Sequence, residues 1–175
     1  FSSNAGSLQQ FCNWLTYNYP QYAEQLTAYP LCSVSFDEAW KNIAANDYDG
    51  FLGAQYEYTK EIYYDRACEV LGDAGWHIEK HAEIMQDVVW SRAVQYGVGN
   101  IIDMWTDAVH SMYNVEDGTY VGYPNLTYVD SAEFDYDFIV AIYNVCKSEK
   151  WNSSALRDSL NNRFDQEMHD ALARL

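Results

Sequence analysis

Residues 79–96 form the most apolar segment of the chain and read Glu-Lys-His-Ala-Glu-Ile-Met-Gln-Asp-Val-Val-Trp-Ser-Arg-Ala-Val-Gln-Tyr. Helical spacing places apolar residues on two sides of this segment: Met85, Val88, Val89 and Ala93 on one, and Trp90, Val94 and Gly97 on the other. A helix that is apolar almost all round is normally buried at the centre of a bundle. We therefore predict a helical fold built around residues 79–96.

The same helical spacing continues on both sides of this segment. Proline occurs only at positions 20, 30 and 124, so long intervals contain no helix breaker. Further helices are predicted from these apolar stripes: Leu8, Phe11, Cys12 and Leu15; Phe36, Trp40, Ile43 and Ala44; Phe51, Ala54, Tyr58 and Ile62; Ile101, Met104, Trp105, Ala108, Val109 and Met112; Phe134, Phe138, Ile142 and Val145; Leu156, Leu160, Phe164, Met168 and Leu172. A short helix is also predicted from Pro20 to about Ala28. We expect Ser35 or Asp37 to cap the next helix, which carries Phe36, and Ser153 or Ser154 to cap the last helix.

Residues 114–132 interrupt the helical pattern with a polar segment that contains several Tyr and Gly residues. Its two Tyr-Val steps suggest a short hairpin near 118–129, and a loop of this length inside a compact domain is usually functional or mobile. No linker or internal repeat is evident. We predict an all-α fold, a single-domain helical bundle over residues 1–175.

Composition and charge exclude several classes of protein. Hydrophobic residues make up 49% of the chain, which excludes intrinsic disorder. The net charge of −16 repels phosphate groups, and no run of Lys or Arg offsets it, so we expect neither nucleic-acid nor anionic-membrane binding. No stretch approaches the roughly 20 apolar residues of a membrane span. Such a charge keeps an aromatic-rich protein soluble, and it also suits an extracellular or phage-borne protein.

The cysteines and histidines match no metal or redox motif. The four cysteines permit two disulfides in three connectivities, and their pattern does not choose between bonded and free thiols: Cys12, Cys32, Cys68 and Cys146. His77 and His81 have i, i+4 spacing, but the residues between them fit neither HEXXH nor HXXEH. We expect two exposed histidines at a helix start, with no metal site and no bound cofactor.

A polar stripe crosses the apolar central helix. Asp87, Ser91 and Gln95 are four residues apart, and therefore share one face. Because buried polar groups need hydrogen-bond partners, this stripe either joins an internal network that keeps helices in register or lines a cleft. Gln55 is a similar amide within an apolar stripe, and it would extend such a network if it faced the central helix.

The run Gln86-Asp87-Val88-Val89-Trp90-Ser91-Arg92-Ala93-Val94-Gln95-Tyr96-Gly97 resembles a segment of lysozyme-like peptidoglycan hydrolases. These proteins occur at the C-terminal ends of type VI secretion spike proteins and among phage endolysins and tail lysins. Four other stretches agree with the family in order and spacing: residues 6–15, residues 36–41, Phe51…Gln55…Tyr58, and Ile139…Ile142-Tyr143. The chain departs from the family at Tyr96, where a histidine is usual, and in the length of 114–132.

The resemblance implies glycosidic-bond hydrolysis of muramidase type, in which a carboxylic acid of raised pKa protonates the leaving oxygen. In the family the catalytic glutamate lies in a segment that would precede Phe1, so we expect the chain to be part of a longer protein and the catalytic residue to be upstream. Residues 1–175 would supply the helical wall of the cleft. The residues expected near peptidoglycan glycan strands are Trp90, Ser91, Gln95 and Tyr96, with Gln55 in support.

Asp87 is a candidate orienting carboxylate, although a buried structural carboxylate is the alternative. The resemblance further implies a protein that is secreted or delivered by a phage and acts at the cell wall, joined to an upstream segment. Two other functions stay open: a non-catalytic glycan-binding or structural helical module, and a helical domain that binds another protein.

Overall fold

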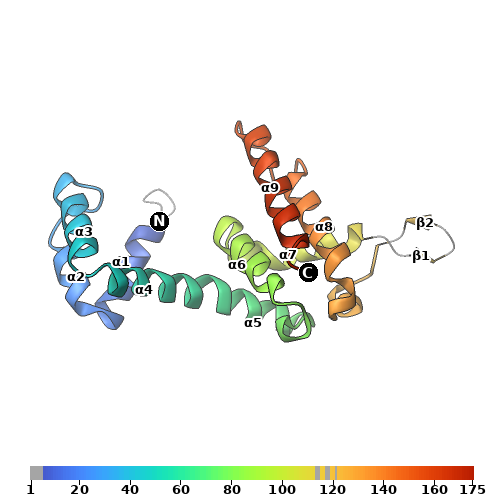
Figure 1. Ribbon diagram of the computed structural model, residues 1–175, viewed down its shortest axis with the longest axis horizontal. Coiled ribbons are helices and arrows are strands. Elements are labelled where there is room, and N and C mark those ends of the chain that lie inside the picture. The colour runs from blue at the N-terminus through green and yellow to red at the C-terminus, as the bar shows by residue number, and fades with distance from the viewer. Residues whose placement is uncertain (1–5, 113–114, 117–118, 121) are drawn as a thin grey trace. The chain divides into compact units, whose positions relative to one another are not determined.

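The computed structural model describes residues 6–112, 115–116, 119–120 and 122–175. Its contacts group the chain into two compact units, residues 1–62 and residues 63–175, and the division falls within the π-helix Lys60–Asp65. Apart from one two-stranded hairpin, the regular structure of the described residues is helical (Figure 1). The predicted all-α class is confirmed. The single-domain assignment stays a prediction.

The described residues of the first unit form four α-helices: α1 (Ser7–Asn18), α2 (Pro20–Thr27), α3 (Val34–Asn46) and α4 (Tyr48–Thr59). The apolar stripe of α1 is buried as predicted, and α2 begins at Pro20, where a fixed φ favours the first helical turn. The predicted caps of α3 are wrong. Ser33 has extended backbone angles, and its hydroxyl accepts a hydrogen bond of 3.1 Å from the Phe36 amide, so the helix begins earlier than Ser35 would place it.

Aromatic rings fill the core of the first unit. Phe11 is fully buried, and the centroid of its ring lies 5.2 Å from Tyr58, 5.8 Å from Trp40 and 6.4 Å from Phe51. Trp40 and Phe51 meet edge to face at 4.8 Å. These rings come from α1, α3 and α4, so their packing joins three helices through buried aromatic contacts.

The second unit contains five α-helices: α5 (Arg66–Asp73), α6 (Ile84–Tyr96), α7 (Ile101–Ser111), α8 (Asp135–Lys147) and α9 (Arg157–Leu172). Short 3-10 helices occupy Ile78–Lys80, Val98–Asn100, Leu126–Val129 and Ala132–Phe134. The most extensive helix contacts within this unit are between α7 and α8 and between α8 and α9, and α8 and α9 lie side by side in Figure 1. The core is closed around α8, in which eight residues are buried.

The central helix is only partly as predicted. The side formed by Met85, Val88, Val89 and Ala93 is buried, which confirms that half of the pattern. The other side is not buried: Trp90 is half-buried, and Val94 is 50% exposed. The expectation of a helix apolar all round and buried in a bundle is therefore wrong, because one face of α6 remains at the surface.

Two helix boundaries also differ from the prediction. The helix α6 begins at Ile84 rather than near residue 79, because carboxylates from the distant residues Asp130 and Asp135 bind the preceding segment. The helix α9 begins at Arg157. Neither Ser153 nor Ser154 caps it, although the hydroxyl of Ser154 accepts a 3.3 Å hydrogen bond from Leu156 just before it.

The hairpin lies earlier than predicted. Strand β1 (Val115–Glu116) pairs with β2 (Thr119–Tyr120) in antiparallel register, whereas the hairpin was expected near 118–129. The second Tyr-Val step, at residues 128–129, belongs to a 3-10 helix in which Val129 is fully buried. Val129 belongs to the core of the second unit, and its segment forms a helical turn rather than a second strand.

Candidate functional site

A surface groove in the second unit is formed along α6 and α9. It has a volume of about 560 Å³, and its lining residues are Asp87, Trp90, Ser91, Val94, Gln95, Arg163 and Glu167. Four of the predicted site residues, those at positions 87, 90, 91 and 95, line this single groove. The groove exists because α6 leaves this face outside the core while its opposite face packs inward.

Hydrogen bonds connect the two helices along this groove. The Arg92 guanidinium donates to the Ser91 hydroxyl at 2.8 Å and to a carboxylate oxygen of Glu167. The other oxygen of Glu167 is 2.9 Å from Nε of Arg163, which also donates to the side-chain oxygen of Gln95. The polar stripe of α6 therefore lines a groove and also belongs to an interhelical network, so both interpretations of the sequence describe part of it.

Arg92 belongs to this network and was not among the predicted site residues, and neither were Arg163 and Glu167, which line the groove. The Arg92 side chain is fully buried, and Nη1 lies 3.2 Å from the sulfur of Cys146. Its guanidinium carbon is 5.1 Å from the ring centroid of Tyr143 and 5.2 Å from that of Phe164. A buried guanidinium is stable only with a charged or hydrogen-bonded partner. A single arginine within an otherwise apolar face was the available signal.

Asp87 is not the buried carboxylate that the sequence suggested as the alternative. Its side chain is 59% exposed, and one of its oxygens forms a 2.6 Å ion pair with Arg174, beyond the end of α9. A carboxylate at this position of α6 faces solvent because the buried side of the helix lies opposite. Exposed ion pairs of this kind contribute little to stability, about 0–1 kcal/mol.

Tyr96 and Gln55 are not among the residues that line the groove. The Tyr96 ring packs edge to face against Trp151 with centroids 5.7 Å apart, and burial raises the pKa of its hydroxyl. Gln55 belongs to the first unit, where its amide donates a 3.2 Å hydrogen bond to the Phe51 carbonyl one turn earlier in α4. A link between Gln55 and the polar stripe of α6 stays a prediction.

The side chain of Trp90 packs against a second aromatic ring. Its ring stacks on Tyr64 with centroids 5.3 Å apart and an angle of 29° between the planes. Burial raises the pKa of the Tyr64 hydroxyl. This stacking holds the indole of Trp90 in a defined orientation at the groove.

The two histidines predicted to be exposed bind carboxylates instead. The His81 side chain is only 1% exposed, and its Nδ1 lies 2.6 Å from Asp135, which is buried as well. Its ring stacks on Trp76 at 4.0 Å. His77 Nδ1 lies 2.9 Å from Asp130, which also accepts a 2.6 Å hydrogen bond from the His77 backbone amide.

This cluster of residues 77–82 with Asp130 and Asp135 is an anchor between distant segments. Lys80 forms an ion pair with Asp130, and the Ala82 amide donates to Asp135 at 2.7 Å. Despite burial, the hydrogen bonds from Lys80 and His77 lower the pKa of Asp130. Among the described residues, no group of three or more His, Cys, Asp or Glu side chains is arranged to hold a metal ion.

The four cysteines are free thiols in the structure. Cys12 and Cys146 are buried core residues, as their apolar neighbours in the sequence suggest, and burial raises the pKa of both thiols. Cys32 is exposed, and Cys68 is half-buried.

Comparison with known proteins places the chain in a family. The model of the family described as "Type VI secretion system spike protein VgrG3-like, C-terminal" matches residues 1–168. The chain belongs to this family. A spike protein of a secretion system is secreted or delivered, which agrees with the predicted bacterial, secreted character. No curated protein matches the chain. Where the chain is described, none of its helices is long and apolar enough to cross a membrane.

Proposed function

We propose that this member of the spike C-terminal family is the helical part of a peptidoglycan hydrolase of muramidase type. The observation that supports this most is the groove along α6 and α9. The residues of the run that resembles lysozyme-like hydrolases, Trp90, Ser91 and Gln95, line it together. An aromatic ring beside hydroxyl and amide groups suits a sugar, which has an apolar face and polar edges.

The proposal assigns binding, rather than proton transfer, to the groove residues. A glycosidase needs a carboxylic acid that can give a proton to the leaving oxygen. Both oxygens of Glu167 are bonded to guanidinium groups, and Asp87 is paired with Arg174. Neither carboxylate is placed to give up a proton to a sugar. We therefore propose that the general acid belongs to the upstream segment of the longer protein.

The same ion pairs favour a second candidate function. Both carboxylates of the groove, Asp87 and Glu167, form ion pairs with arginines. Such a groove suits a module that binds glycan, or supports the spike, without hydrolysing the glycan. This candidate predicts retention on insoluble peptidoglycan without release of soluble fragments.

Product analysis separates the two candidates. Purified peptidoglycan is incubated with residues 1–175 alone and with the same chain extended by its upstream segment, and soluble products are identified by mass spectrometry. Muropeptides with new reducing ends, formed only by the longer chain, would support the proposal. Products from the short chain would refute the placement of the acid, and retention without products from either form would favour the non-catalytic module.

A substitution in the groove tests the binding role. Gln95→Ala should weaken retention on insoluble peptidoglycan while thermal unfolding changes little, because Gln95 is at the surface end of the network. Gln86→Ala is the matched control, since Gln86 is an exposed glutamine on the same helix that does not line the groove. Unfolding of the Gln95 variant, instead of lost retention, would assign the stripe a structural role.

A further inference from the structure

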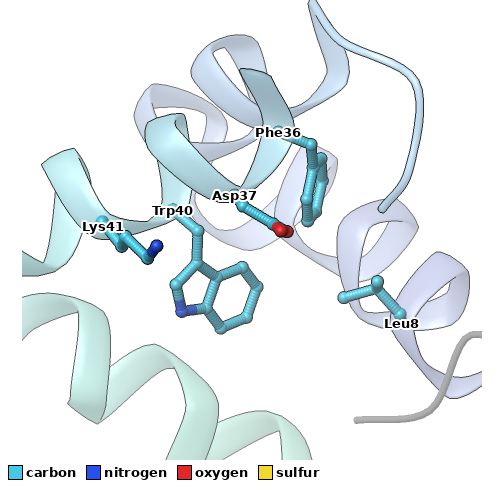
Figure 2. Close-up of a pocket in the computed structure, with 5 residues that line it drawn as sticks. All are labelled: Leu8, Phe36, Asp37, Trp40 and Lys41. Atoms are coloured by element: carbon cyan, nitrogen blue, oxygen red, sulfur yellow. The ribbon is translucent and has the colours of Figure 1, made fainter. Parts of the chain in front are cut away.

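A second pocket lies in the first unit, on the surface of α3 and α1. It has a volume of about 270 Å³ and is lined by Leu8, Phe36, Asp37, Trp40 and Lys41 (Figure 2). Four of these five residues come from the stretch 36–41, which the sequence analysis singled out and the proposed function does not use. Helical spacing explains their convergence, because positions 36, 37, 40 and 41 share one side of α3.

The floor of this pocket is apolar and firmly held. Phe36 is 2% exposed and Leu8 is 9% exposed. Trp40 is half-buried, and its ring packs against Phe51 at 4.8 Å and against Phe11 at 5.8 Å. A ring fixed on two sides in this way presents a surface that needs no reorganisation to receive an aliphatic group.

Opposite charges flank this floor. Asp37 and Lys41 are exposed, and in Figure 2 the Trp40 side chain projects between the Asp37 carboxylate and the Lys41 ammonium group. Within the part of the chain that the structure describes, neither charged group has a hydrogen-bond or ion-pair partner. The pocket therefore presents one acceptor and one donor of opposite charge beside an apolar floor.

We propose that this pocket binds the zwitterionic end of an amino acid, with the ammonium group at Asp37, the carboxylate at Lys41 and the aliphatic stem over Trp40. The pocket is slightly smaller than the roughly 300–1,000 Å³ of drug-sized sites, which suits one amino-acid end. A group without net charge also avoids repulsion by a protein of net charge −16. The inference rests on the wall target of the proposed function, because diaminopimelic acid in wall stem peptides carries such an end.

The test is a titration of the intact chain with the tripeptide L-Ala-γ-D-Glu-meso-diaminopimelic acid, followed by nuclear magnetic resonance at the Trp40 indole N–H. We expect a saturable shift. Asp37→Asn and Lys41→Met should each weaken binding about threefold, and together about tenfold. Glu38→Gln is the matched control, since Glu38 is on the same helix but does not line this pocket. Free meso-diaminopimelic acid distinguishes a soluble amino acid from the wall peptide as the source.

The matched ligand is the tripeptide with L-lysine in place of diaminopimelic acid, which keeps the ammonium group and lacks its neighbouring carboxylate. It should bind more weakly, and Lys41→Met should remove that difference. No saturable shift at Trp40, equal binding of the two tripeptides, or affinity unchanged in the double variant would each overturn the inference. Glycan hydrolysis by the extended chain without tripeptide binding would refute this inference alone, whereas tripeptide binding without hydrolysis by the extended chain would refute only the enzymatic proposal.

Discussion

The two units hold their helices together by different kinds of contact. The first unit has a core of aromatic rings, and none of its described charged side chains is buried. The second unit buries Arg92 and Asp135 among its apolar side chains. Aromatic rings contribute mainly through the apolar area that they bury, whereas a buried charge needs a partner in a defined place. The stability of the first unit should therefore depend mainly on buried side-chain volume. The stability of the second unit should depend on the hydrogen-bond and ion-pair partners of its buried charges, and on pH.

The largest effect is expected in the ring core of the first unit. Phe11→Ala removes a fully buried ring of α1 that contacts rings from α3 and α4, and should lower the free energy of unfolding by about 4 kcal/mol. Phe11→Leu keeps most of the volume and should cost about 1 kcal/mol. Urea titration followed by circular dichroism measures both. Equal costs for the two variants would contradict a core that depends on volume.

A somewhat smaller effect is expected at the buried charge of the second unit. Arg92→Ala should lower the free energy of unfolding by about 3 kcal/mol, because it removes a guanidinium that bonds Ser91 and Glu167. Glu167→Gln retains a hydrogen-bonding oxygen and is the matched control, with an expected cost of about 1 kcal/mol. An Arg92→Ala variant as stable as this control would show that the network does not hold α6 to α9.

The cluster around Asp130 should make the free energy of unfolding depend on pH. Asp130→Ala removes hydrogen bonds to His77 and an ion pair to Lys80, and should cost about 2 kcal/mol at neutral pH. Since the pKa of Asp130 is lowered in the folded protein, its contribution is fully present above the unfolded pKa of about 3.9 and is lost as the pH falls through the lowered value. The urea midpoints of the unmodified protein and of the Asp130→Ala variant should differ at neutral pH and converge at acidic pH. A constant difference at every pH would contradict this.

The smallest effect is expected at the N-terminus of α3, where the observed cap differs from the predicted one. Ser33→Ala removes the hydroxyl that accepts from the Phe36 amide, and should cost about 1 kcal/mol. Ser35→Ala, in the first turn of the same helix, should change stability by less than about 0.5 kcal/mol. Thermal unfolding compares the two directly. The reverse order would assign the cap to Ser35.

Local patterns predicted most of the helices, and distant contacts account for what they missed. The stripe of Leu8, Phe11 and Leu15 is buried because helical spacing alone defines that face. By contrast, His81 is buried through Asp135, 54 positions away, and Arg92 through Glu167, 75 positions away. No spacing rule within one helix shows such partners, so the predicted start of α6 and the predicted exposure of His81 are wrong.

The sequence also predicted only part of the candidate site, namely the wall that α6 forms. Trp90, Ser91 and Gln95 line one groove, as a shared face of one helix requires. The opposite wall could not be predicted, because Arg163 and Glu167 reach the groove only through the packing of α9 against the rest of the second unit. Tyr96 follows Gln95 directly, yet the helical turn carries its ring away from the groove residues and toward Trp151.

The most direct test of the account is to locate a bound glycan on the molecule. Soluble peptidoglycan oligosaccharides without stem peptides are titrated into isotope-labelled protein, and amide and side-chain resonances are followed. The account predicts saturable shifts at Ser91, at the Gln95 side-chain amide and at the Trp90 indole, with the amides of Trp76 and His81 unchanged. Saturable shifts confined to other surfaces, with these three groups unmoved, would contradict the claim that the groove along α6 and α9 is the glycan site.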